Sequence, residues 1–100
     1  MYEIIENTKL NPTVSKMVVK EKDIAAKALP GQFVILRADE NGERIPLTVA
    51  DTDPESGTVT IIYQHVGATT IQLSEMKKGD GLHDFTGPLG RPTEIQGLKK

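Results

Sequence analysis

The chain has 100 residues, of which 37% are hydrophobic and 26% are charged, and its formal net charge is −2. These values predict one globular domain over residues 1–100 and exclude a disordered, fibrous or membrane-spanning chain. Charges of both signs are interspersed without the basic stripe of a nucleic-acid-binding protein, and the absence of cysteine excludes disulfides, zinc–thiolate sites and iron–sulfur clusters held by this chain.

The first third of the chain predicts two strands and a short helical turn. Residues 2–10 alternate apolar and polar side chains, and residues 14–20 are rich in valine. Residues 23–28 favour a helical turn in which Asp23 is the N-cap. The first six residues show neither the basic start nor the apolar run of a secretory signal, so a cytoplasmic protein is expected.

The middle of the chain predicts three more strands separated by turns. The apolar run at residues 33–36 is typical of a strand buried on both faces, and the Pro30-Gly31 turn before it is expected to deliver Phe33 inward. Strands are also predicted at residues 45–50 and 58–66. In the second of these, Val59, Ile61 and Tyr63 share one face.

A helix from Thr69 or Thr70 to about Lys77, and a last strand at residues 81–86, complete the predicted elements. Short strands at regular spacing with one helix before the final strand predict an all-β fold, a small antiparallel barrel.

Three segments could carry chemistry: Arg44-Ile45-Pro46-Leu47-Thr48, Gly67-Ala68-Thr69-Thr70 and Gly87-Pro88-Leu89-Gly90. An arginine can bond two oxyanions at once. A glycine and small residues at a helix start expose N–H groups that favour phosphate, although threonine there is also an ordinary cap. Two glycines around a proline predict a tight turn.

In this order and at these separations, the three segments resemble the flavin-binding barrel of the ferredoxin–NADP reductase superfamily. The closest likeness is to the branch that contains the electron-transfer subunit of dihydroorotate dehydrogenase B, sulfide dehydrogenase subunits and the small subunit of NADH-dependent ferredoxin:NADP oxidoreductase. Residues 79–90 follow that branch's Gly-Asp-x-Leu-x-Asp-x-x-Gly-Pro-Leu-Gly pattern, and residues 30–33 resemble its Pro-Gly-Gln-Phe turn. The resemblance implies a six-stranded antiparallel Greek-key barrel with one short helix at an open end.

The resemblance also implies the residues that contact the cofactor. In the superfamily, an Arg-x-Tyr-Ser/Thr motif places arginine at a phosphate, tyrosine on the flavin ring and the hydroxyl near flavin N5; Leu47 and Thr48 stand in the last two places here. Arg44 lies one residue further back, which turns it to the opposite face unless a bulge intervenes, and a solvated arginine is the alternative. The implied contacts are Arg44, Pro46, Leu47, Thr48, Tyr63, Gln64, His65, Val66, Gly67, Thr69 and Thr70.

His65 is not expected to be catalytic, because no serine, cysteine or carboxylate is spaced to complete a triad with it. The carboxylates at positions 51, 53 and 55 flank Pro54 and Gly57, which favours a polar turn over a metal site. No catalytic or metal-binding residue is therefore predicted.

The implied function is that of an FAD-binding module in an electron-transfer subunit, which passes electrons between NAD(P)H and an iron–sulfur or ferredoxin partner. Its implied partners are an NAD(P)-binding domain and an iron–sulfur or catalytic subunit, with neither nucleic acid nor membrane. No Gly-x-Gly-x-x-Gly fingerprint occurs, so an isolated flavin domain is expected, inactive alone and able to lose FAD. The alternative is a non-catalytic small β-barrel that binds another ligand.

Overall fold

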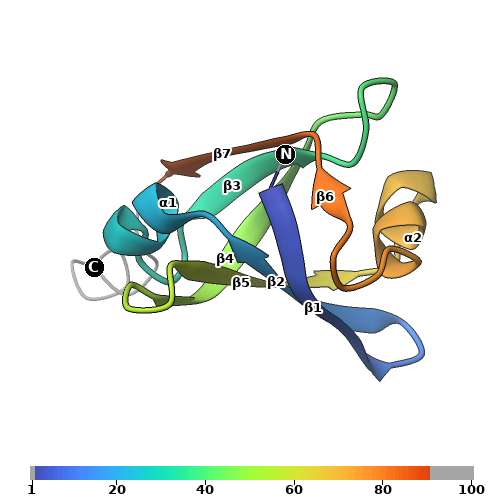
Figure 1. Ribbon diagram of the computed structural model, residues 1–100. Helices are drawn as coiled ribbons and strands as arrows, with labels where there is room; N and C mark the ends of the chain where they lie inside the picture. Colours follow the sequence, from blue (N-terminus) through green and yellow to red (C-terminus); the bar gives the residue numbers. More distant parts are fainter. Residues whose placement is uncertain (1, 91–100) are drawn as a thin grey trace, which may run out of the picture.

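In the computed structural model, which describes residues 2–90, seven antiparallel strands form one sheet that curls into a nearly closed barrel (Figure 1). The strands are β1 (Tyr2–Asn11), β2 (Val14–Lys20), β3 (Phe33–Arg37), β4 (Ile45–Asp53), β5 (Thr58–Gln64), β6 (Gly81–Leu82) and β7 (Asp84–Leu89), and their order in the sheet is β6-β1-β2-β5-β4-β3-β7. This confirms the predicted all-β antiparallel barrel. The last strand expected from the sequence divides at His83 into β6 and β7.

Buried side chains alternate along the strands and meet inside the barrel. They include Met17 and Val19 of β2, Val34 and Leu36 of β3, Val49 of β4, and Val59, Ile61 and Tyr63 of β5. The alternation predicted for β5 is thus confirmed. The prediction for β3 was wrong, because Phe33 and Ile35 stay partly exposed and only one face is buried. A strand of a small barrel turns one face to the interior and the other outward, so Phe33 does not point inward.

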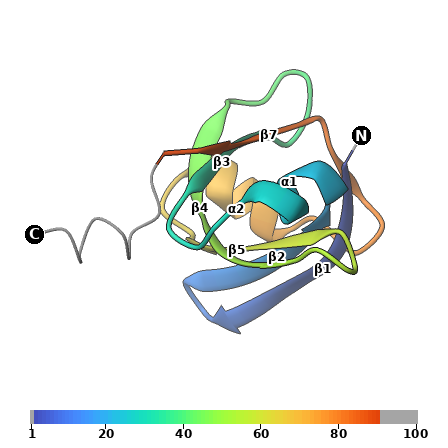
Figure 2. The same cartoon turned by 90° about the vertical axis from the view of Figure 1, so that its left-hand side faces the viewer.

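Two short helices close the opposite ends of the barrel (Figures 1 and 2). Helix α1 (Lys22–Lys27) inserts Ile24 and Ala25 at one end, and α2 (Ala68–Ser74) inserts Leu73 at the other. The sequence prediction of Asp23 as N-cap was wrong: Glu21 is the N-cap, and its side chain accepts from the Asp23 N–H at 2.8 Å. Neither helix in residues 2–90 has the length and hydropathy needed to cross a membrane.

A polar network joins α2 to the strands. The Asn7 side-chain amide on β1 donates to the carbonyl oxygens of Leu73 and Met76, each at 2.8 Å. These two bonds attach the last turn of α2 and the residues just after it to β1. The Asn7 side-chain oxygen accepts from the Tyr63 hydroxyl at 3.1 Å. Helix α2 ends at Ser74, short of the Lys77 expected from the sequence. The network holds α2, and with it the turn before the helix, at a fixed place on the barrel.

Tyr63 makes the stability of the fold depend on alkaline pH. Burial raises the pKa of the Tyr63 phenol above its ordinary value, and hydrogen bonds to Ser15 and Asn7 oppose only part of this effect. The unfolded chain therefore loses this proton at a pH where the folded protein keeps it. We expect the free energy of unfolding to be insensitive to this group below about pH 10 and to fall as the pH rises from there toward the folded-state pKa. Urea unfolding at increasing pH should show a shallower fall for Tyr63→Phe, and an equal fall would contradict this assignment.

Candidate functional site

The first half of β4 presents a row of side chains on the outer surface of the barrel. Ile45 and Leu47 are half-buried and pack against the core, while Pro46 and Thr48 are exposed. Arg44, directly before the strand, is exposed as well. By the alternation of a strand, Arg44 shares the outward face of Pro46 and Thr48, so the row spans about 13 Å at ~3.3 Å per residue.

This half of β4 pairs with β3 alone. Its residues Ile45 to Thr48 lie opposite Leu36 to Phe33, whereas the ladder to β5 begins only at Val49, opposite Ile61. No residue from 2 to 90 hydrogen-bonds the Thr48 hydroxyl. Leu47, expected at the ring-stacking place, is half-buried and packs part of its side chain against the core.

The segment at the end of β5 alternates between core and surface. Tyr63 is buried, Gln64 and Val66 are exposed, and His65 is half-buried. The Ser15 hydroxyl on β2 lies 2.8 Å from Nε2 of His65. This contact was missed by the sequence reasoning, because Ser15 precedes His65 by half the chain and only the β2–β5 ladder brings them together. Ser15 is 0% exposed, so no substrate reaches its hydroxyl.

The turn before α2 is built by Thr70. Its hydroxyl accepts from the N–H groups of Val66 and Gly67 at 2.9 and 3.1 Å, and it donates to the Gly67 carbonyl at 3.0 Å. One donor and two acceptor positions are all that a hydroxyl has, so these three bonds use its full capacity. In this structure Thr70 shapes the turn from within, and its hydroxyl is not turned to solvent.

Gly67 and Thr69 lie on the outside of the same turn. Gly67 has an extended backbone with φ −164° and ψ 176°, which any residue adopts, and a Cβ added there would meet no atom within 4 Å. Packing within residues 2–90 therefore does not require glycine at this position. The Thr69 hydroxyl donates to the carboxylate of Glu43 at 3.0 Å, and Glu43 directly precedes Arg44 in the sequence.

The Gly87–Gly90 segment closes the barrel against β3. Gly90 has φ +79°, and a Cβ there would lie 2.9 Å from the Phe33 ring, so both conformation and space require glycine. Gln32 fixes this junction: its side-chain amide donates to the Gly90 carbonyl at 2.8 Å, and its side-chain oxygen accepts from the Leu29 N–H at 2.9 Å. The Pro-Gly-Gln-Phe turn therefore has an architectural role, although it does not deliver Phe33 inward.

Two contacts at the start of β4 involve the first two segments and the start of β7. Glu43 bonds Thr69 in the second segment, and Nη2 of Arg44 lies 3.2 Å from Oδ2 of Asp84, at the start of β7, which leads into the third. Residues 2–90 enclose no pocket, so the arrangement is an open surface. They also hold no group of three or more histidine, aspartate or glutamate side chains that could bind a metal. The surface offers hydrogen-bond donors, the Arg44 cation, the Glu43 carboxylate and the exposed backbone around Gly67.

Comparison with known proteins gives close relatives over nearly the whole chain. No model of a known protein family matches it. An uncharacterized protein from the adh 3′ region of Clostridium beijerinckii is 48% identical over 105 residues, which is 100% of this chain and 36% of that protein. A dihydroorotate dehydrogenase B (NAD(+)) electron transfer subunit homolog from Thermotoga maritima is 46% identical over 94% of this chain and 33% of its own length. The dihydroorotate dehydrogenase B (NAD(+)) electron transfer subunit from Fusobacterium nucleatum is 34% identical over 95% of this chain and 38% of its own length.

A solved structure agrees with these relatives. The NADH-dependent reduced ferredoxin–NADP oxidoreductase, described in terms of flavin-based electron bifurcation, matches with a TM-score of 0.88 and 44% identity over 92% of this chain. The match covers 33% of that chain. The present chain thus spans about a third of the length of the relatives that it matches.

Proposed function

Because the chain belongs to the ferredoxin–NADP reductase superfamily, in the branch of the dihydroorotate dehydrogenase B electron-transfer subunits, we propose that it is the FAD-binding module of an electron-transfer oxidoreductase subunit. The observation that carries the proposal is the likeness to the solved oxidoreductase at 44% identity and a TM-score of 0.88.

The residues present fit a flavin nucleotide. Among residues 2–90, no neighbour requires glycine at position 67, which leaves room for a ligand beside the exposed backbone of the turn. Arg44 supplies a cation on the same face as Thr48, and the row between them is long enough for separate parts of one extended molecule. Arg44 and the neutral donors suit a ligand with a phosphate group at one end and an uncharged ring at the other, and the Glu43 carboxylate on the same surface accepts from Thr69.

In the proposed site, Arg44, Gly67 and Thr69 lie toward the phosphate-bearing part, and Thr48 donates its hydroxyl toward the ring. Pro46, Leu47 and the residues from Gln64 to Val66 provide the apolar and backbone surface between them, while the buried Tyr63 supports that segment from inside the barrel. Thr70 acts indirectly, by holding the turn through its three bonds to backbone. A bound flavin would take hydride from a reduced nicotinamide and release electrons singly, while the chain positions it and excludes water from one side.

The partners in this proposal are an NAD(P)-binding domain and an iron–sulfur or catalytic subunit. The support is that the relatives are named as electron-transfer subunits and that this chain spans only about a third of them. An open surface without an enclosed pocket is expected to bind FAD weakly by itself, because small-molecule sites usually lie in clefts and at domain interfaces.

Gly67→Val tests the site and the function together. The valine side chain would occupy the space left beside the turn, so FAD affinity should fall by about tenfold or more, a loss of about 1.4 kcal/mol. The fold should persist, because the extended backbone accepts valine and no neighbour is displaced. FAD fluorescence titration, with circular dichroism as a folding check, measures both.

Ala26→Val is the matched control, since Ala26 is an exposed residue of α1 at the opposite end of the barrel. It should leave FAD affinity unchanged. Failure of the parental chain to bind FAD at about 1 mM, the level of a ~4 kcal/mol interaction, would argue for the alternative of a small β-barrel that binds another ligand. Equal affinity in Gly67→Val and the parental chain would place the ligand elsewhere.

A further inference from the structure

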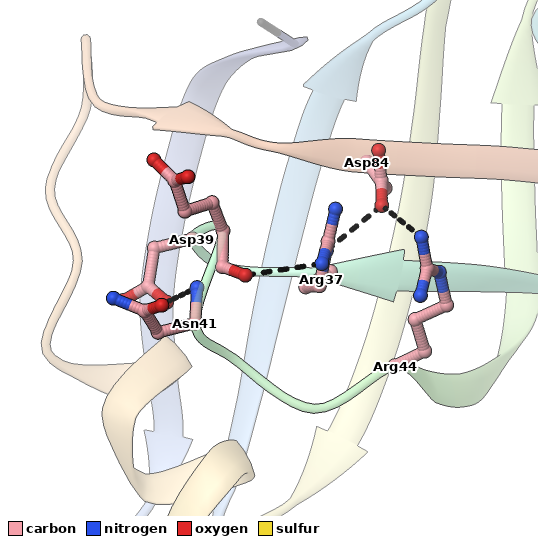
Figure 3. Close-up of polar contacts among 6 residues, drawn as sticks. Arg37, Asp39, Asn41, Arg44 and Asp84 are labelled. Carbon is pink, nitrogen blue, oxygen red and sulfur yellow. Dashed lines mark hydrogen bonds and ion pairs between the residues drawn. The ribbon is translucent and has the colours of Figure 1, made fainter.

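Asp84 serves two arginines at once. Its Oδ2 lies 2.9 Å from Nε of Arg37 and 3.2 Å from Nη2 of Arg44, so one carboxylate oxygen stands between two guanidinium groups (Figure 3). Arg37 also donates from Nη1 to the carbonyl oxygen of Glu40 at 3.1 Å. The three charged residues come from three different parts of the chain.

The strand register explains this meeting. Arg37, the last residue of β3, lies directly opposite Asp84, the first residue of β7. On the other side of β3, Leu36 lies opposite Ile45, which brings Arg44 alongside Arg37. Leu36, Ile45 and Phe85, each next to one of the charged residues, pack in the core, and alternation therefore turns the three charged side chains outward.

The two arginines are not equivalent. The side chain of Arg37 is 17% exposed and hydrogen-bonds the Glu40 carbonyl in addition to its ion pair with Asp84, whereas that of Arg44 is 62% exposed and forms an ion pair only with Asp84 among residues 2–90. Two guanidinium groups and one carboxylate leave a net charge of +1. A guanidinium has five N–H donors, so Arg44 keeps several for a further acceptor. Arg37 and Asp84 form the fixed pair, and Arg44 is the member that faces solvent.

We propose that Asp84 is a positioning residue, which holds Arg44 so that its remaining donors recognise the phosphate-bearing part of a flavin nucleotide. This rests on the proposed function and adds a residue to it. An exposed arginine without a partner distributes over many rotamers, and ordering it on binding costs free energy. Asp84 restricts that freedom beforehand, and Arg37 in turn prevents Asp84 from turning away. Asp84 itself does not touch the ligand.

The test is a double-mutant cycle read with three flavins. Asp84→Asn, Arg44→Gln and the double variant are titrated with riboflavin, which has no phosphate, with FMN and with FAD, at physiological ionic strength. An ion pair this exposed contributes modestly, so Asp84→Asn should weaken FAD and FMN binding by about two- to fivefold. It should leave riboflavin binding unchanged, and it should have no effect on any flavin in the Arg44→Gln background.

Other outcomes would overturn the proposal. A purely structural role predicts an equal loss for riboflavin, FMN and FAD, in both backgrounds. Tighter FAD binding by Asp84→Asn would show that Asp84 competes with the ligand for Arg44. If the parental chain binds all three flavins equally, the flavin function stands but phosphate recognition by Arg44 fails; if it binds none, the function fails as well. Should Asp84→Asn not fold, Asp84→Glu, which keeps the charge and moves it, enters the same cycle with the same expected pattern.

Discussion

Truncation of Ile61 to alanine is expected to lower the free energy of unfolding by about 2–5 kcal/mol, a large part of the stability of a domain of this size. Ile61 is 0% exposed and lies where three strands meet, opposite Met17 on β2 and Val49 on β4. Neighbours on both sides are fixed by backbone ladders, so the cavity left by the lost atoms cannot close easily. Urea unfolding followed by circular dichroism measures the change.

The next residue provides the control. Ile62 is the same residue type in the same strand, but it faces outward and is 43% exposed. Ile62→Ala should change the free energy of unfolding by less than about 1 kcal/mol, because much of the Ile62 side chain remains in contact with water in the folded protein. Similar losses for the two variants would show that the inward and outward faces of β5 are not those described here.

Asn7→Ala is expected to lower the free energy of unfolding by about 2–4 kcal/mol, although the residue removed is polar. The amide of Asn7 serves the carbonyl oxygens of Leu73 and Met76, and its oxygen serves the buried Tyr63 hydroxyl. Alanine leaves all three without this partner. Because the two carbonyls are at the end of α2, hydrogen exchange should show faster opening of residues 68–74 than of the β2–β5 ladder.

Tyr63→Phe separates the two halves of this network. It removes one hydrogen bond and keeps both contacts to α2, so its effect should be about 0.5–1.5 kcal/mol, with the exchange of α2 little changed. An Asn7→Ala protein as stable as Tyr63→Phe would mean that α2 does not depend on Asn7. Under the proposed function, Asn7→Ala should also weaken FAD binding more than Tyr63→Phe does, since the turn at Gly67 is carried by α2.

The features that were predictable from sequence are those with a local cause. Alternation places Val59, Ile61 and Tyr63 on one face whatever the rest of the chain does. Strands β4 and β5 begin where expected, but β4 continues to Asp53, beyond the expected residue 50, and β5 ends at Gln64, before the expected residue 66. The prediction for residues 33–36 was wrong because four consecutive apolar side chains are compatible both with a strand buried on two faces and with a strand buried on one. The structure shows that one face of β3 is only partly covered, with Phe33 packed on Gly90 instead of in the interior.

The candidate site was predicted only in part, because its geometry depends on which strands are neighbours. Arg37 and Asp84 meet because β3 pairs with β7, and the spacing of the two residues in the sequence does not predict that pairing. The same holds for Ser15 with His65, and for Asn7 with α2. Thr70 was predicted as a ligand donor from its place at a helix start, whereas capping takes its whole hydrogen-bonding capacity. Which residues contact a flavin stays a prediction.

The position of β6 and β7 has a consequence for the time course of folding. These strands lie at the two edges of the sheet and are separated by His83 alone, yet one pairs with β1 and the other with β3. Of the described strands, β1 is synthesised first. Its second neighbour in the sheet, β6, pairs with it at Tyr2 and Leu82 and is synthesised almost last. The β1–β2 hairpin can form early, while the sheet stays open until almost all of the described chain has been made. Topologies with such distant pairings fold in about milliseconds to seconds, and we expect the pairing of β6 with β1 to be among the last steps of barrel assembly.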